Sequence, residues 1–168
     1  MRFLLLDANV LIDFYDADPT VFAIVASSVG EVQVASPVLA EVKQLSEVET
    51  QRIGVKVIDP PIEMLSKVAQ RGGALAFADR LCLELARAEG WTCVTNDRPL
   101  RRECEAVGVP ILWGLELIAL TVEAGGLPAS DAAELGRTIA DANRYITEDV
   151  LERFLSRIGQ RKRGRGRK

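Results

Sequence analysis

The sequence of 168 residues contains no histidine. This absence excludes Ser-His-Asp and Cys-His nucleophilic catalysis, general acid–base chemistry by histidine, and every zinc site with a histidine ligand. Cysteine is scarce as well. Cys82, Cys93 and Cys104 are odd in number and lack CxxC spacing, so we expect no disulfide framework and read Cys82 and Cys93 as core residues. Carboxylates are therefore the leading candidates for any chemistry that this protein performs.

Long hydrophobic runs are also missing. The apolar run 3–6 is too short for a signal peptide, and the apolar stretch 111–122 is too short to span a bilayer and contains Glu116. We therefore expect a cytoplasmic protein that has no contact with a membrane. Apolar residues make up 48% of the chain and charged residues 27%, which is typical of a soluble globular protein.

The net charge of −3 is unevenly distributed along the chain. Six of the 21 Lys and Arg residues lie in 161–168, which contains no acid, so the rest of the chain is distinctly acidic. We predict that residues 160–168 form a disordered basic tail. It either adds non-specific RNA affinity through counterion release or is simply a solubilising or cloning-derived end.

Short apolar runs alternate with helical patterns over the first two thirds of the chain. Continuous apolar segments of this length are typical of strands that are buried on both faces of a parallel sheet. We expect strands at 3–6, 32–35, 55–58, 91–94 and 109–112, with helices between them, including one from Ser36 to about Ser46. The alternation predicts an α/β fold with a doubly wound, mostly parallel, five-stranded sheet.

The pattern after residue 112 is wholly helical. A helix at 113–124 ends at a Gly-Gly pair, a second begins at Ser130-Asp131, and a third begins at Thr147-Glu148. The last two predict a helical hairpin at about 130–159, appended to an α/β core at about 1–125. We expect residues 1–159 to form a single domain.

Four acidic residues occupy similar positions relative to the predicted strands. Asp7 follows the first strand directly, and Glu41 lies in the first or second turn of the helix after the second strand. Asp79 lies near the start of the helix before the fourth strand, and Asp97 follows that strand at a helix N-cap. Strand carboxyl ends and the helix N-termini that follow them share one edge of an open parallel sheet, so these carboxylates can converge there.

Such convergence is costly without a cation, because neighbouring carboxylates raise one another's pKa. An all-oxygen donor set without His or Cys selects a hard cation, Mg²⁺ or Mn²⁺. This combination indicates metal-assisted phosphodiester hydrolysis, in which one ion activates water and a second stabilises the leaving oxygen.

Each acidic residue also has an ordinary interpretation. Asp97 alone is a helix cap, Glu41 alone is a first-turn Glu that matches the helix dipole, and Asp79 alone is solvated helix surface. Asp7 is the stronger candidate, since a carboxylate that ends an apolar strand is costly unless it is paired, solvated or metal-bound. Arg98 is either a phosphate contact or a surface arginine.

The acidic residues after the first strand, Asp13, Asp16 and Asp18, fit a solvated helix end better than metal ligands. Glu84 lies about 140° around its helix from Asp79, so we expect it outside the site. Trp91 and Trp113 are interpreted as packing residues rather than platforms for stacking bases.

Four short segments resemble, in order, the four motifs of PIN domains: LLDANV at 5–10, PVLAEV at 37–42, ADRL at 78–81 and VTNDR at 94–98. The resemblance covers about residues 2–115. The helical hairpin looks like the C-terminal part of a PIN subgroup of uncharacterised prokaryotic proteins, and it is a departure from the shortest PIN-domain toxins.

The resemblance implies a ribonuclease that depends on Mg²⁺ or Mn²⁺ and leaves 5′-phosphate and 3′-hydroxyl ends. Asp7, Glu41, Asp79 and Asp97 would be its catalytic and metal-binding residues. Asn9 and Thr95 would be polar supports that orient the carboxylates or a metal-bound water. Many small prokaryotic members are VapC-like toxins, so the resemblance also implies an RNA substrate, a protein antitoxin and a homodimer.

Two other functions remain open. A haloacid-dehalogenase-like phosphatase also has an Asp after its first strand, but it normally carries a second Asp two residues later, where this chain has Asn9. The second alternative is a catalytically inactive PIN-fold module that only binds a partner. The presence of all four acids disfavours this reading.

Overall fold

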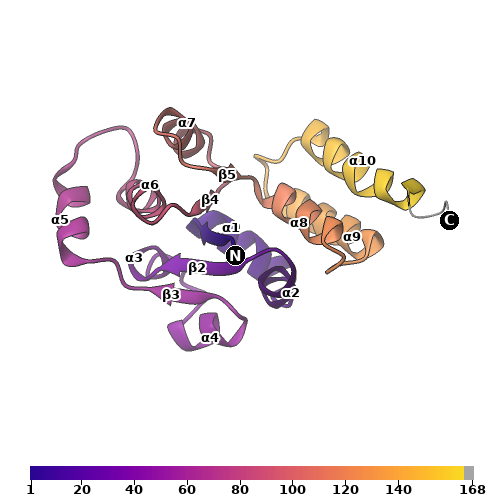
Figure 1. Ribbon diagram of the computed structural model, residues 1–168, viewed down its shortest axis with the longest axis horizontal. Helices are drawn as coiled ribbons and strands as arrows, with labels where there is room; N and C mark the ends of the chain where they lie inside the picture. Colours follow the sequence, from indigo (N-terminus) through magenta and orange to yellow (C-terminus); the bar gives the residue numbers. More distant parts are fainter. Residues whose placement is uncertain (165–168) are drawn as a thin grey trace.

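Five parallel strands form one sheet at the centre of the molecule (Figure 1). The computed structural model describes the backbone of residues 1–164 and the side chains of residues 1–159. The order of the strands is β3-β2-β1-β4-β5. Their bounds are β1 (Phe3–Leu6), β2 (Glu31–Ala35), β3 (Lys56–Ile58), β4 (Thr92–Val94) and β5 (Ile111–Leu112). The predicted α/β class with a five-stranded parallel sheet is confirmed.

The central strand is β1, and it explains the apolar run at the start of the sequence. Leu4, Leu5 and Leu6 are fully buried, as expected for a parallel strand that is covered on both faces. Leu4 lies opposite Val32 of β2 on one side and opposite Thr92 of β4 on the other. The chain therefore builds outward from β1 in two directions. The boundary between β1 and β4 is the switch point at which open α/β sheets place their ligands.

Seven helices connect or flank these strands: α1 (Ala8–Ala17), α2 (Val21–Ser28), α3 (Ser36–Leu39), α4 (Glu47–Arg52), α5 (Ile62–Gln70), α6 (Phe77–Glu89) and α7 (Arg98–Ala106). Helix α2 packs on β2, whereas α6 packs on β1 and β4. Crossovers between parallel strands are right-handed, so the reversal of strand order at β1 places these two helices on opposite faces of the sheet.

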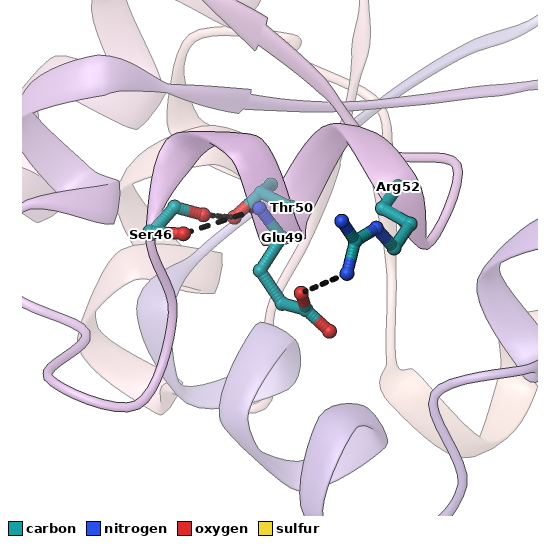
Figure 2. Close-up of polar contacts among 4 residues, drawn as sticks. All are labelled: Ser46, Glu49, Thr50 and Arg52. Atoms are coloured by element: carbon teal, nitrogen blue, oxygen red, sulfur yellow. Dashed lines mark hydrogen bonds and ion pairs between the residues drawn. The ribbon is translucent and has the colours of Figure 1, made fainter.

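The helix expected from Ser36 to about Ser46 is wrong in length. Helix α3 ends at Leu39, and the next residues form tight turns, with the Glu41 amide bonding to the Val38 carbonyl at 3.1 Å. A separate helix, α4, then begins after Ser46. Figure 2 shows the reason: the Ser46 hydroxyl accepts the Glu49 amide at 3.2 Å and so caps the new helix.

Helices α8 (Gly114–Glu123), α9 (Ala129–Ala142) and α10 (Glu148–Gly164) pack together at one end of the molecule (Figure 1). Gly136 permits a close approach of α9 and α10, since a Cβ atom there would lie 2.3 Å from the Phe154 ring. Helix α9 begins at Ala129 after Pro128, so Ser130 is not its cap. Helix α10 reaches Gly164, into the predicted tail, and 165–168 lie outside the described residues.

The scarce cysteines and tryptophans have structural roles in the described part of the chain. All three cysteines are free and buried, which confirms the expectation of no disulfide framework. Trp91 packs against Phe3, with ring centroids 5.9 Å apart. No helix within the described residues combines the length and the apolar character needed to span a bilayer.

Candidate functional site

Asp7 lies at the switch point, immediately after β1. Its backbone amide extends the β1–β4 pairing by donating to the Val94 carbonyl at 3.1 Å. Its carboxylate caps α1, because Oδ1 accepts the Val10 amide at 2.7 Å. Oδ2 is buried and has no hydrogen-bond partner among the described residues, and the residue is only 2% exposed. A buried carboxylate oxygen without a partner is costly, and a cation would satisfy it.

The surroundings of Asp7 favour its neutral form when no metal is bound. Burial raises the pKa of Asp7 to about 7. The Thr95 side chain and the Val10 amide favour the charged carboxylate and so lower the pKa, but by less than burial raises it. The nearby carboxylates of Asp79 and Asp13 raise the pKa further. Asp7 is therefore protonated in about half of the metal-free molecules near pH 7, and a bound cation would displace that proton.

Thr95 and Asp97 follow β4 and face the same switch point. Thr95 is fully buried, and its hydroxyl accepts the Asp97 amide at 3.0 Å. Asp97 caps α7, as predicted, with its Oδ1 accepting the Leu100 amide at 2.8 Å. This bond fixes the orientation of the Asp97 carboxylate, while its second oxygen remains available to a ligand. Asp97 is half-buried.

Asp79 connects the remaining acids electrostatically. It lies in the first turn of α6, and burial raises its pKa, which the carboxylates of Asp97 and Glu41 raise further. Glu41 is exposed in the turn after α3 rather than on a helix, because α3 ends at Leu39. Asp79 thus lies within electrostatic reach of Asp7, Glu41 and Asp97 at the carboxyl edge of the sheet.

The carboxylates are neighbours without forming a closed metal cage. Within the described residues, no three His, Cys, Asp or Glu side chains are grouped closely enough to hold one metal ion. Mg²⁺ keeps several waters and binds through one or two carboxylates, so it does not require such a cage. The all-oxygen donor set and the unpartnered Oδ2 of Asp7 fit a hard divalent cation, and Asp79 is the candidate acid whose charge acts on Asp7.

The other predicted residues have different positions. Asn9 is exposed in the first turn of α1, and Arg98 is exposed beside Asp97. Thr95 forms a hydrogen bond with the backbone of Asp97, as expected for a supporting residue. Asn9 forms no hydrogen bond with a carboxylate within the described residues. Glu84 lies away from the four acids and pairs with Arg71 and, at 3.8 Å, with Lys67.

Asp13 has a role that the sequence interpretation missed. It is half-buried rather than fully solvated, and its Oδ2 accepts the Asn143 side chain at 2.7 Å and the Asn96 side chain at 3.4 Å. Asn96 in turn accepts the Gly114 amide at 3.0 Å. Asp13 therefore connects α1, the loop that carries Asp97, and the end of α9. Asn96, between Thr95 and Asp97, was the one feature of the sequence that could have indicated this role. The position of Asn143 beside Asp13 follows only from the tertiary structure.

Comparisons with known proteins identify the fold. No protein-family model matches this sequence, and no curated protein matches it. A solved structure of a PilT N-terminus (PIN) domain protein from the hyperthermophilic archaeon Sulfolobus solfataricus P2 is similar, with a TM-score of 0.51 and 16% sequence identity. The match covers 73% of this chain and 95% of that chain. At this level of identity the similarity shows the architecture: the chain has the fold of a PIN domain.

Proposed function

We propose that this protein is a metal-dependent endoribonuclease that hydrolyses RNA phosphodiester bonds at the carboxyl edge of its sheet. The observation that carries the proposal is the buried Asp7 carboxylate, with Oδ2 unpartnered among the described residues and with Asp79 within electrostatic reach. The PIN-type fold and the order of the four acidic motifs support it. A phosphatase of the haloacid-dehalogenase type is disfavoured because Asn9 stands at the position of the expected second Asp.

The residues would act in distinct ways. Asp7, Asp79 and Asp97 would hold one or two Mg²⁺ or Mn²⁺ ions, partly through bound water, and Glu41 would complete the acidic rim. When bound, such ions supply an activated water nucleophile and stabilise the leaving oxygen. The Leu100 amide keeps the Asp97 carboxylate oriented, and Thr95 fixes the backbone of that loop. Arg98, exposed beside Asp97, is placed to contact a phosphate of the RNA.

The test is cleavage of single-stranded and structured RNAs with Mn²⁺, with Mg²⁺ and with EDTA. We expect cleavage that needs the metal, leaves 5′-phosphate and 3′-hydroxyl ends, and is lost in Asp7→Asn purified in the same way. Cleavage that persists in Asp7→Asn would refute the site. Metal binding without cleavage of any RNA would favour a module that only binds a partner.

We further propose, on the resemblance to VapC-like proteins, that the chain is the toxin of a toxin–antitoxin pair. It would act as a homodimer in the cytoplasm and be inhibited by a protein antitoxin. Induced expression in a bacterial host should arrest growth for the wild type and not for Asp7→Asn. Light scattering of the purified protein should give twice the mass of one chain, and a monomer would contradict the dimer.

A further inference from the structure

A second cavity, separate from the carboxylate site, lies beside α6. Its volume is about 190 Å³, and its walls come from the end of α5, the loop 71–75, α6 and α7. The α6 residues that line it, Arg80, Leu83, Glu84 and Arg87, have the spacing of one helix face. Asp79 lies about 100° around the helix from Arg80 and does not line the cavity. Helix α5 and the loop 71–75, which contribute to the cavity wall, lie at the end of the molecule opposite α9 and α10 (Figure 1).

Arg80 presents a buried charged donor that has no acceptor. Its Nη1 donates to the Leu75 carbonyl, which holds the guanidinium against the loop before α6. Its Nε is buried and has no hydrogen-bond partner among the described residues. A buried donor on a charged group is costly to leave unpaired. The Nε–H group of Arg80 is such an unsatisfied donor among the described residues.

The charges around the cavity favour an anion. The side chain of Glu84 is only 10% exposed and is neutralised by Arg71 and by Lys67. Arg80 and Arg87 form no ion pair within the described residues, and Glu103, exposed like Arg87, is the one other acid that lines the cavity. The remaining charge in the cavity is therefore positive, in a protein whose body is acidic.

The loop beside the cavity is open to a ligand. Gly72 and Gly73 line the cavity, and a Cβ atom at either position would meet nothing within 4 Å. Gly73 has a φ of 143°, a conformation that glycine adopts without strain. The backbone of this loop is thus accessible next to the guanidinium of Arg80.

We propose that this cavity binds a phosphate oxyanion, with the guanidinium groups of Arg80 and Arg87 as donors. The planar fork of arginine donors suits phosphate oxygens. We assign the phosphate to the RNA strand because α6 carries both Asp79 and Arg80, on faces about 100° apart. This assignment rests on the proposed ribonuclease function. The oxyanion site itself does not.

The experiment measures binding in EDTA, so that it is independent of cleavage. A labelled single-stranded oligoribonucleotide is titrated at several KCl concentrations, and inorganic phosphate is added as a competitor. The proteins are the wild type, Arg80→Gln, Arg80→Lys and Arg87→Gln. Arg137→Gln, an exposed arginine on α9, is the matched control. Circular dichroism confirms the fold of each variant, and Arg87→Gln tests the site even if Arg80 is needed to anchor the loop.

For Arg80→Gln and Arg87→Gln we expect the slope of log affinity against log salt to fall by about 0.7, the value for one phosphate contact on a single strand. Arg80→Lys keeps the charge and loses the Nε donor, so its slope should stay while its affinity falls. Inorganic phosphate should compete for the wild type and not for Arg80→Gln. Behaviour of both Gln variants like Arg137→Gln would overturn the site.

Two further outcomes separate the sources of the anion. In the first outcome, inorganic phosphate stabilises the wild type against heat, and Arg80→Gln has the same RNA salt slope as the wild type. This outcome would overturn the RNA strand as the source of the anion and leave a site for free phosphate. In the second outcome, Arg80→Gln has a smaller salt slope for RNA binding, but the wild type cleaves no RNA with any metal. This outcome would reject the nuclease function and support the phosphate site.

Discussion

Replacing Asp7 by Asn should stabilise the metal-free protein, and more so as the pH rises. Burial raises the pKa of Asp7 from 3.8 to about 7, so the folded state holds a proton that the unfolded chain releases. Stability is therefore lost as the pH rises from about 4 to about 7, and changes little from this group above that. Asn keeps the Oδ1 that accepts the Val10 amide and cannot ionise.

The magnitude follows from the two pKa values. Full ionisation of Asp7 in the folded protein costs about 4 kcal/mol relative to the unfolded chain. Between pH 4.5 and pH 8, the stability advantage of Asp7→Asn over the wild type should grow by about 3 kcal/mol. The sign is the reverse of a salt-bridged aspartate, whose removal costs stability at high pH.

Urea unfolding in EDTA at these two pH values measures the effect. Asp141→Asn, an exposed carboxylate on α9, is the control for removing a charge. Saturating Mn²⁺ at pH 8 should raise the stability of the wild type and leave Asp7→Asn unchanged. A stability difference between the wild type and Asp7→Asn that is the same at both pH values would refute the account of a buried carboxylate whose ionisation is costly.

Substitutions at three other positions test the supporting structure. Asp97→Ala should cost about 1 kcal/mol of stability in urea unfolding through loss of the α7 cap, whereas Asp97→Ser keeps a cap and should lose only metal binding. Asn143→Ala removes the 2.7 Å bond to Asp13 and should speed amide exchange at 95–97 and in α9, unlike Thr138→Ala, whose hydroxyl bonds only within its helix. Ser46→Ala should also cost about 1 kcal/mol and speed exchange in α4; equal exchange would contradict its role as the cap.

The sequence was sufficient to predict the centre of the fold. The apolar run before Asp7 had to be a buried strand, and the alternation of strands and helices led to the parallel sheet. Asp97 was recognisable as a cap because Pro99 follows it in the first helical turn. These predictions succeeded because each depends on neighbours in the sequence.

Features that depend on residues far apart in the chain could not be predicted from the sequence. The pattern from Ser36 fits one continuous helix to about Ser46, whereas α3 ends at Leu39 and turns lead to the Ser46 cap of α4. Asp13 resembled a solvated helix end, because the sequence gives no way to place Asn143 against it. The same limit applies to the acids: their order predicts one edge of the sheet, while their separation depends on side-chain packing.

The central claim is that these carboxylates hold a divalent metal ion, and Mn²⁺ binding tests it most directly. Electron paramagnetic resonance at pH 8 reports free Mn²⁺ without any assumption about the RNA. We predict binding by the wild type, its loss in Asp7→Asn, weaker binding in Asp79→Asn and Asp97→Asn, and no change in Asp141→Asn. Equal Mn²⁺ affinity of Asp7→Asn and the wild type would contradict the account.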